Sequence, residues 1–178
     1  PSHPAIGERQ PIDSEGTVVH QTRIVENGRL LTPLYTLATA EEDRSISTGS
    51  AGRVDRMTGS LPISLTTVPA VLYVEPGGCS PDEMVAGMGT GLLLTYSLDL
   101  FHSVNIASGE FSVPCGGVFF KDGSPAGFVQ QITAAGNLRD LWANISCVGN
   151  DLGFDEFYLK SYTIGSPSAL IQQLRIEA

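Results

Sequence analysis

Two turn signals between runs of β-prone residues most constrain how this chain can fold. Glu26-Asn27-Gly28 separates TVVHQTRIV from RLLTPLY, and Lys121-Asp122-Gly123 follows GEFSVPCGGVFF. Asn-Gly and Asp-Gly favour the left-handed backbone of tight hairpin turns, which join neighbouring antiparallel strands. The sequence therefore predicts one hairpin over Val18–Tyr35 and a second at Asp122.

Further strands and helices follow from local patterns. The runs PAVLYVEP, LLLTYSLDLF, GFVQQITA, FYLKSYTI and ALIQQLRIEA predict strands. A short helix is predicted at Leu37–Asp43, and a second at Ser80–Met88, where Ser80, Pro81 and Glu83 form a helix-start signature. No alternation of strand and helix marks a parallel sheet. We expect an α+β fold, mainly antiparallel β (a curled sheet or barrel-like), with about three short helices and about seven to nine strands.

A third helix is predicted over Leu138–Val148. Its apolar stripe comprises Leu138, Leu141, Trp142 and Ile145. Asn137 suits its N-cap and Gly149 its C-terminal end. We expect the stripe to dock on the sheet and to bury Trp142. The flanking Gly136-Asn137 and Gly149-Asn150-Asp151 turns are either plain caps or strand ends held close to a cleft.

Composition excludes several classes of protein. Ten basic and nineteen acidic residues give a net charge of −9, which opposes binding to nucleic acid phosphates. No apolar run reaches the roughly 18 residues that a membrane span needs. The polar segment 45–61 predicts a loop. No break in composition marks a domain boundary, and this loop is the favoured position for a seam between domains. Three cysteines, far apart in sequence, predict reduced thiols of a cytoplasmic protein rather than a disulfide framework.

No complete catalytic constellation is visible in the residues. His3, His20 and His102 lack the spacing of a metal site. Cys115 lies in a Pro-Cys-Gly-Gly bend that favours tight packing, although a hydrolase built on this thiol stays open as an alternative. ASGEFS lacks the glycines of a nucleophile elbow, and GMGTG follows a helix rather than a strand, unlike a phosphate-binding loop.

Six stretches, in order along nearly the whole chain, resemble the C-terminal half of the TldD/PmbA family. They are PIDSEGTVVHQTRIVENGRL, STGSAGR, LYVEPGGCSPDEM, GEFSVPCGGVFFKDG, AAGNLRDLWANISCVGND and GSPSALIQQLRI. The resemblance implies a two-subunit cytoplasmic metallopeptidase, in which a TldD-like chain carries zinc and a PmbA-like (TldE) chain does not. It also brings the family name of modulator of DNA gyrase, although the negative charge argues against direct DNA contact. Residues 1–178 are then expected to be the C-terminal domain of a longer protein whose N-terminal half is absent.

The chain departs from the zinc-bearing pattern of that family. There, two histidines of an HExxxH helix in the N-terminal half and a cysteine after the GnD segment hold the metal. This chain has no cysteine after Asp151, and Cys147 precedes the segment, inside the predicted helix. Ser50 and Gly52 also stand where the family often has Asn and Arg. These departures favour a PmbA/TldE-like chain with no catalytic residue, metal or cofactor of its own.

The expected role is therefore to form a peptide-holding cavity and a partner interface. The partner is a TldD-like zinc-bearing homologue or a second copy, bound through strands in Gly91–Ala134, and the substrates are extended peptides. The rival reading is a non-catalytic β-rich interaction or scaffolding domain. The candidate substrate or cavity residues are Ser108, Gly109, Glu110, Phe111, Ser112, Asn137, Asn150 and Asp151.

Overall fold

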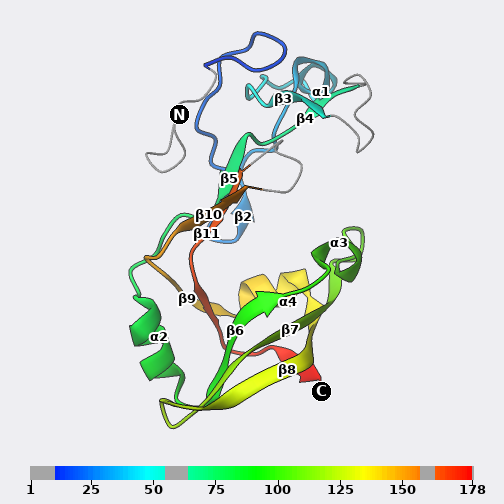
Figure 1. Cartoon of the computed structure of the whole chain (residues 1–178). Helices are drawn as coiled ribbons and strands as arrows, with labels where there is room; N and C mark the ends of the chain where they lie inside the picture. Colours follow the sequence, from blue (N-terminus) through cyan, green and yellow to red (C-terminus); the bar gives the residue numbers. More distant parts are fainter. Residues whose placement is uncertain (1–10, 55–63, 157–162, 178) are drawn as a thin grey trace. The chain divides into compact units, whose positions relative to one another are not determined.

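The computed structural model describes residues 11–54, 64–156 and 163–177, and the chain divides into two compact units. The first unit comprises residues 1–74 and 153–166, and the second comprises residues 75–152 and 167–178. The chain passes between the units three times, so the boundary is not the single seam expected within residues 45–61. The elements of both units are labelled in Figure 1.

Strands dominate the described residues, which form thirteen strands and four short helices. All strand pairings but one are antiparallel, and these residues form no closed barrel. The α+β, mainly antiparallel prediction is confirmed, in its curled-sheet rather than its barrel form. Strands are more numerous than expected for two reasons. Strands form at residues 51–54, 64–67, 145–148 and 153–156, where none was predicted, and the run ALIQQLRIEA divides into two.

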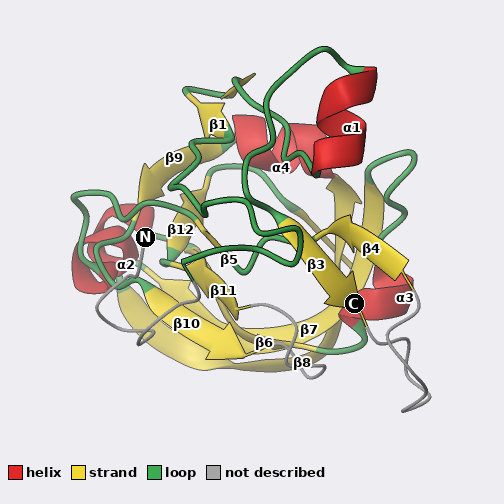
Figure 2. Cartoon of the chain, turned by 90° about the horizontal axis from the view of Figure 1, so that it is seen from above, coloured by secondary structure: helices red, strands yellow, loops and turns green. Residues whose placement is uncertain are grey.

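A four-stranded antiparallel sheet forms the centre of the second unit, and its long strands curve together in Figure 2. Its strands, in the order β13-β8-β7-β6, are β6 (Gly91–Ser97), β7 (Glu110–Lys121), β8 (Ser124–Asn137) and β13 (Arg175–Glu177). The turn between β7 and β8 has φ 50° at Asp122 and 74° at Gly123. Positive φ at both central residues is the geometry of a type I′ turn, so the second predicted hairpin is confirmed.

The two faces of this sheet differ. On one face Cys115, Ile132 and Ala134 are buried, with Leu92, Val129 and Leu174 packed against them. On the other face Leu93 pairs with Val118, and Val118 pairs with Phe128. Directly paired residues place their side chains on the same face, so these three form an apolar row across β6, β7 and β8.

Three helices accompany the sheet in the second unit. They are α2 (Pro81–Met88), α3 (Leu100–Ser103) and α4 (Leu138–Ala143). In α2 the Ser80 hydroxyl accepts the Glu83 N–H at 3.2 Å, and the Glu83 carboxylate accepts the Ser80 N–H at 2.8 Å, which confirms the predicted capping box. The run LLLTYSLDLF was expected to be one strand, but β6 ends at Ser97 and α3 begins at Leu100.

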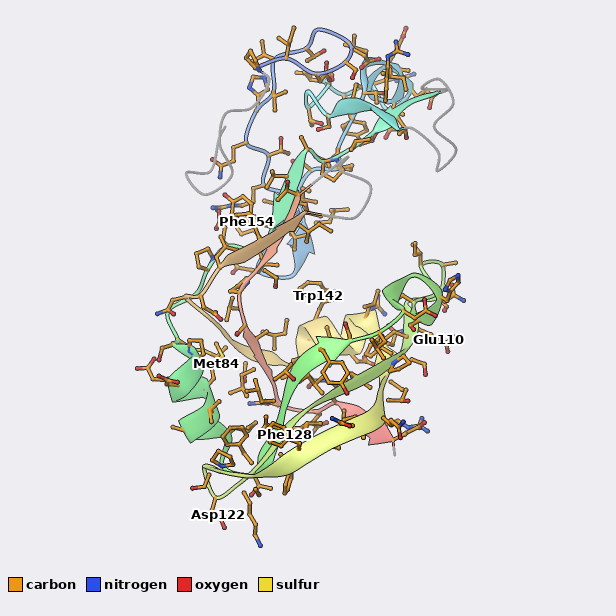
Figure 3. The ribbon with its side chains drawn as sticks, in the orientation of Figure 1. Met84, Glu110, Asp122, Phe128, Trp142 and Phe154 are labelled. Atoms are coloured by element: carbon orange, nitrogen blue, oxygen red, sulfur yellow. A yellow bond between two sulfur atoms is a disulfide. The ribbon has the colours of Figure 1, made fainter. Side chains whose placement is uncertain are left out.

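The helix expected over Leu138–Val148 is wrong in length and orientation. Asn137 caps it as predicted, by accepting the Arg139 N–H at 2.9 Å, but α4 ends at Ala143. Residues Ile145–Val148 form β9 instead, which pairs with β12 (Ala169–Ile171), and this long-range pairing outweighs the local helical pattern. Trp142 is 57% exposed and points away from the sheet (Figure 3), so the predicted burial of its indole is wrong.

The first unit begins with a much smaller hairpin. Strands β1 (Val25–Glu26) and β2 (Arg29–Leu30) are joined by Asn27 and Gly28, which have φ 49° and 74°. The predicted turn is confirmed, but the strands are two residues long. Helix α1 (Leu37–Glu42) follows, and Thr36 forms a capping box with Thr39 at its start.

The remaining strands of the first unit form two small sheets. They are β3 (Ala51–Val54), β4 (Ser64–Thr67), β5 (Val71–Tyr73), β10 (Gly153–Glu156) and β11 (Thr163–Ser166). Strands β3 and β4 pair with each other, and the second sheet has the order β10-β11-β5, with β11 and β5 parallel. Residues 51–54 were expected to be loop. Residues 55–61 of that predicted loop, and 157–162 of the run FYLKSYTI, lie outside the described residues.

Candidate functional site

Five of the eight candidate residues meet where β7 begins and β8 ends. We call Ser108, Gly109, Glu110 and Asn137 the strand-entrance cluster; Phe111 lies beside it. Glu110 pairs with Asn137 in the sheet, and the Asn137 amide donates to the Ser108 carbonyl at 3.0 Å. The Ser108 hydroxyl donates to the Glu110 carboxylate at 3.2 Å and accepts the Glu110 N–H at 3.3 Å. Figure 3 shows Glu110 at the end of β7 that lies opposite the Asp122 turn.

The local sequence explains this arrangement. The Asn105 side-chain oxygen accepts the N–H groups of Ala107 and Ser108, at 3.0 and 3.2 Å, which closes a turn before β7. Gly109 then has φ 76°, a conformation that side-chain-bearing residues rarely adopt. An added Cβ at this position would also lie 3.2 Å from the Asn137 side chain.

Phe111 and Ser112 continue β7 beyond the cluster. Phe111 is buried and packs on Gly136, where an added Cβ would lie 3.3 Å from its ring. Ser112 is exposed and pairs with Ala135. Phe111 therefore supports the cluster from within the fold, while Ser108, Glu110 and Ser112 face solvent.

Asn150 and Asp151 lie in a second group of residues, and no described contact links it to the strand-entrance cluster. We call this group, residues 77–79 and 147–151 together with Ser168, the disulfide clamp. Asn150 N–H donates to the Cys79 carbonyl at 2.8 Å, and Gly77 N–H donates to the Gly149 carbonyl at 2.7 Å. A parallel bridge between Cys79 and Gly149 joins the same two segments.

Asp151 closes the clamp on its other side. Its carboxylate accepts the Ser168 N–H at 2.9 Å and the Ser168 hydroxyl at 2.6 Å. Both bonds stabilise the charged form, the hydroxyl most, and hold the pKa of Asp151 below its ordinary value. Gly149 leaves room for this arrangement, because an added Cβ would press on the Asp151 carboxylate and lie 3.0 Å from the Ser168 carbonyl oxygen. Asp151 is therefore an exposed, ionised acceptor at neutral pH.

The cysteines differ from the expectation of three reduced thiols. Cys79 and Cys147 form a disulfide, with their Cα atoms 6.5 Å apart, and only Cys115 is free. The two residues are 68 positions apart in sequence. The Cys79–Gly149 bridge and the placement of Cys147 in β9 rather than in a helix bring them together. Local sequence carries no signal for such a contact.

The described histidines and acidic residues assemble no metal centre. Within residues 11–54, 64–156 and 163–177, no three His, Cys, Asp or Glu side chains form a group that could hold a metal ion. His102 lies 2.7 Å from the Asp99 carboxylate on an exposed part of α3, and His3 lies outside the described residues. The described residues thus do not fit a zinc ion.

Sequence reasoning missed one polar residue that organises the first unit. The Asp13 carboxylate accepts the N–H groups of Glu15, Thr17 and Ala51, each at 2.9 Å. Burial raises the pKa of Asp13, but these three bonds outweigh it, so the pKa lies below its ordinary value. The signal for the first two bonds was present, since Asp commonly binds backbone N–H groups two and four residues on in turns.

No helix in the described part of the chain has the length and apolarity to cross a membrane.

Known proteins are similar to this chain in both sequence and fold. Metalloprotease PmbA of Escherichia coli O157:H7 is 33% identical over 144 residues, which cover 80% of this chain and 28% of that protein. A homologue from Haemophilus influenzae is also 33% identical, over 145 residues, with the same coverage. The chain thus spans about 28% of the length of these relatives.

Two solved structures extend the comparison. A Thermotoga maritima MSB8 protein named as a modulator of a DNA gyrase superposes with a TM-score of 0.77 and 30% identity, covering 94% of this chain and 35% of that one. TldE from Thermococcus kodakarensis superposes with a TM-score of 0.83 over 99% of this chain and 38% of that one; at 22% identity it shows the shared fold. The family described as PmbA/TldA metallopeptidase C-terminal domain matches residues 1–178. The chain belongs to the PmbA/TldA metallopeptidase C-terminal domain family.

Proposed function

We propose that this chain is the C-terminal domain of a PmbA/TldE-like component of a cytoplasmic TldD/TldE-type metallopeptidase. In this proposal it forms part of a cavity that holds an extended peptide, and it binds a TldD-like partner that supplies the zinc. Family membership supports the assignment, and the E. coli relative is itself named a metalloprotease.

The arrangement of the possible ligand side chains supports the assignment of zinc to the partner. Zinc is bound by deprotonated thiolates, imidazoles and carboxylates. Within residues 11–54, 64–156 and 163–177 no three His, Cys, Asp or Glu side chains gather into such a set, and Cys115 is 3% exposed in the core of the second unit. Burial also takes the Cys115 sulfur away from solvent, which argues against the alternative of a hydrolase built on this thiol.

The apolar row on the sheet supports a partner interface. Phe128 is 86% exposed, and Leu93, in the same row, is 40% exposed. The Tyr96 side chain extends the patch on this face, because it lies over Gly116, next to Val118. A connected apolar patch on a sheet is typical of a protein-binding surface. We therefore place the partner on this face of β6, β7 and β8.

A free sheet edge supports peptide binding. Within the described residues β6 pairs only with β7, so the backbone of Gly91–Ser97 has no partner on its outer side. An extended peptide can add to such an edge as a further strand, with its backbone supplying the hydrogen bonds. The strand-entrance cluster lies at one end of this sheet, where Ser108 and Glu110 offer exposed polar groups to the peptide.

Reconstitution tests the proposal. The full-length protein, a TldD-like homologue and a mixture of both are assayed for cleavage of an unstructured peptide, and zinc is measured in each. We expect cleavage only in the mixture and zinc only with the homologue. Cleavage by the full-length protein alone would overturn the assignment, whereas binding without cleavage would favour the scaffolding alternative.

A matched pair of variants tests the interface. Phe128→Ser should weaken association with the homologue by at least about tenfold, because it removes the most exposed ring of the apolar row. Ile106→Ser is the control, since Ile106 is 93% exposed but lies outside the row. Light scattering and titration measure both. Equal affinities for the two variants would exclude this face as the interface.

A further inference from the structure

We propose that the Cys79–Cys147 disulfide is a thiol–disulfide redox site, reduced by dithiols, whose oxidation state controls the order of the disulfide clamp. The site is independent of the proposed peptidase function, because it rests on the cysteine pair and the contacts around it. Its relevance to function is that the clamp holds Asn150 and Asp151, two of the candidate cavity residues.

The exposure of the cysteines makes the site selective. Cys79 and Cys147 are both half-buried, so a small dithiol or a dithiol protein can approach the disulfide. Cys115 is 3% exposed and packs with Ile132 and Ala134 in the core. Because access governs thiol–disulfide exchange, the pair reacts in the folded protein while Cys115 does not.

The disulfide joins an exposed segment to a strand. Gly77 and Gly78 are exposed and have no regular secondary structure before α2, whereas Cys147 lies in β9. Three backbone hydrogen bonds connect the same segments: Gly77 to Gly149 at 2.7 Å, Asn150 to Cys79 at 2.8 Å, and Cys79 to Val148 at 3.4 Å. After reduction these three backbone bonds remain between the two segments. Backbone bonds to exposed segments open readily, so the reduced clamp is less ordered.

The order of the clamp extends to Asp151 and Ser168. Gly149 N–H donates to the Ser168 carbonyl at 2.7 Å, and Ser168 in turn donates twice to Asp151. Gly149 is thus bonded to residue 77 on one side and to residue 168 on the other. Release of residues 77–79 therefore removes one of the two sets of bonds that hold the turn of Asn150 and Asp151.

The chemistry balances with a dithiol as the reductant. One thiolate of the dithiol attacks a sulfur of the Cys79–Cys147 bond, forms a mixed disulfide and expels the other cysteine as a thiolate. The second thiol of the reagent then displaces the first cysteine and closes the oxidised reagent. The protein gains two electrons and two protons, which the dithiol loses, and both cysteines end as thiols after proton uptake.

The test equilibrates the full chain at neutral pH in mixtures of reduced and oxidised dithiothreitol. Alkylation of the folded protein, followed by peptide mass mapping, measures the thiols at Cys79, Cys147 and Cys115. Without dithiol we expect the linked Cys79–Cys147 peptides and no labelling of Cys115. As the reduced fraction of the dithiol rises, Cys79 and Cys147 should become labelled together.

Hydrogen exchange and melting report the structural response. Reduction should raise amide exchange by about tenfold or more in residues 77–79 and 147–151, and leave the turn at Asp122 unchanged. The melting temperature should fall by on the order of 10 °C, because the bond closes a long loop in the unfolded chain. The Cys79→Ser/Cys147→Ser double variant should match the reduced protein and show no further change with dithiol.

Three outcomes would overturn the proposal. Labelling of Cys79 and Cys147 in protein kept free of reductant would show that the bond does not form. A linkage that persists at every dithiol ratio in the folded state would show that it is structural. Reduction without any change of exchange in residues 77–79 and 147–151 would show that the bond does not control the clamp. All three rest on the unmutated chain, so they decide the matter even if the double variant fails to fold.

Discussion

The two units differ in what they bury. In the first unit the buried side chains among the described residues are small or polar: Thr36, Ala40, Ser47 and Ala51. In the second unit they include Phe111, Phe120 and Ile132. The first unit therefore depends on bonds from side chains to backbone, such as those of Asp13, whereas the second depends on apolar packing.

The two hairpins show the same difference at a smaller scale. Both turns have positive φ at two successive residues, with nearly equal values. The first turn carries strands of two residues, while the second carries strands of twelve and fourteen. A turn thus reverses the chain, but strand length is set by whether a face can be buried. One face of β7 and β8 covers the core, and Leu30 on β2 is 61% exposed.

The largest expected effect is the loss of a core side chain in the second unit. Ile132→Ala should lower the free energy of unfolding by about 2–5 kcal/mol, because Ile132 is 3% exposed and its removal leaves a cavity. Leu30→Ala in the small hairpin should change it by less than about 0.5 kcal/mol. Denaturant unfolding measures both. A similar loss for the two variants would refute the comparison.

The next effect concerns the polar support of the first unit. Asp13→Asn should destabilise that unit by about 1–3 kcal/mol at neutral pH. The Asp13 carboxylate accepts the three N–H groups on its two oxygens, whereas the asparagine side chain has only one oxygen that can accept. Hydrogen exchange, read separately for each unit, measures the change, since the two units need not unfold together. Faster exchange confined to the second unit would contradict the assignment.

Acidic pH should destabilise the first unit through the Asp13 carboxylate. The pKa of Asp13 is lower in the folded chain than in the unfolded chain, so the unfolded state binds more protons at acidic pH. The stabilisation is fully present above the unfolded pKa of about 4 and is lost as pH falls through the folded value. Asp13→Asn should remove this part of the pH dependence, and exchange of the first unit at several acidic pH values would show it.

The smallest expected effect is on the two hairpin turns, at Gly28 and at Gly123. Gly28→Ala and Gly123→Ala should each cost about 1 kcal/mol, because both glycines have φ 74° and an added Cβ meets no atom within 4 Å. Only backbone conformation is then changed. Exchange should rise at β1 and β2 in the first variant and at the Asp122 turn in the second. A much larger cost at Gly123 would mean that the turn also fixes the register of β7 and β8.

Features that depend on neighbouring residues could be predicted from the sequence. The capping box at Ser80, the helix after Thr36 and both hairpin turns need only a few adjacent residues, and all four are confirmed. Features set by distant partners were missed. Ile145–Val148 has a helical pattern but pairs with β12, and Trp142 consequently belongs to a short helix with its ring exposed.

The candidate site follows the same division. The motif that contains Ser108 and Glu110 was recognised, and the register of β7 and β8 brings Asn137 to it. The partner of Asp151 was not predicted, because Ser168 lies 17 residues away and meets it only in the folded chain. The Cys79–Cys147 pairing has the same cause, over 68 residues.

The three passages of the chain between the units have a consequence for biosynthesis. The first unit needs residues 153–166, and the second needs residues 167–178, which include β12 and β13. When synthesis has reached residue 150 of this sequence, neither unit is therefore complete. β8 is also synthesised before β13, which pairs with it at residues 133–135. The two units should thus not fold strictly one after the other during synthesis, because each is completed only by residues that follow the other's first segment.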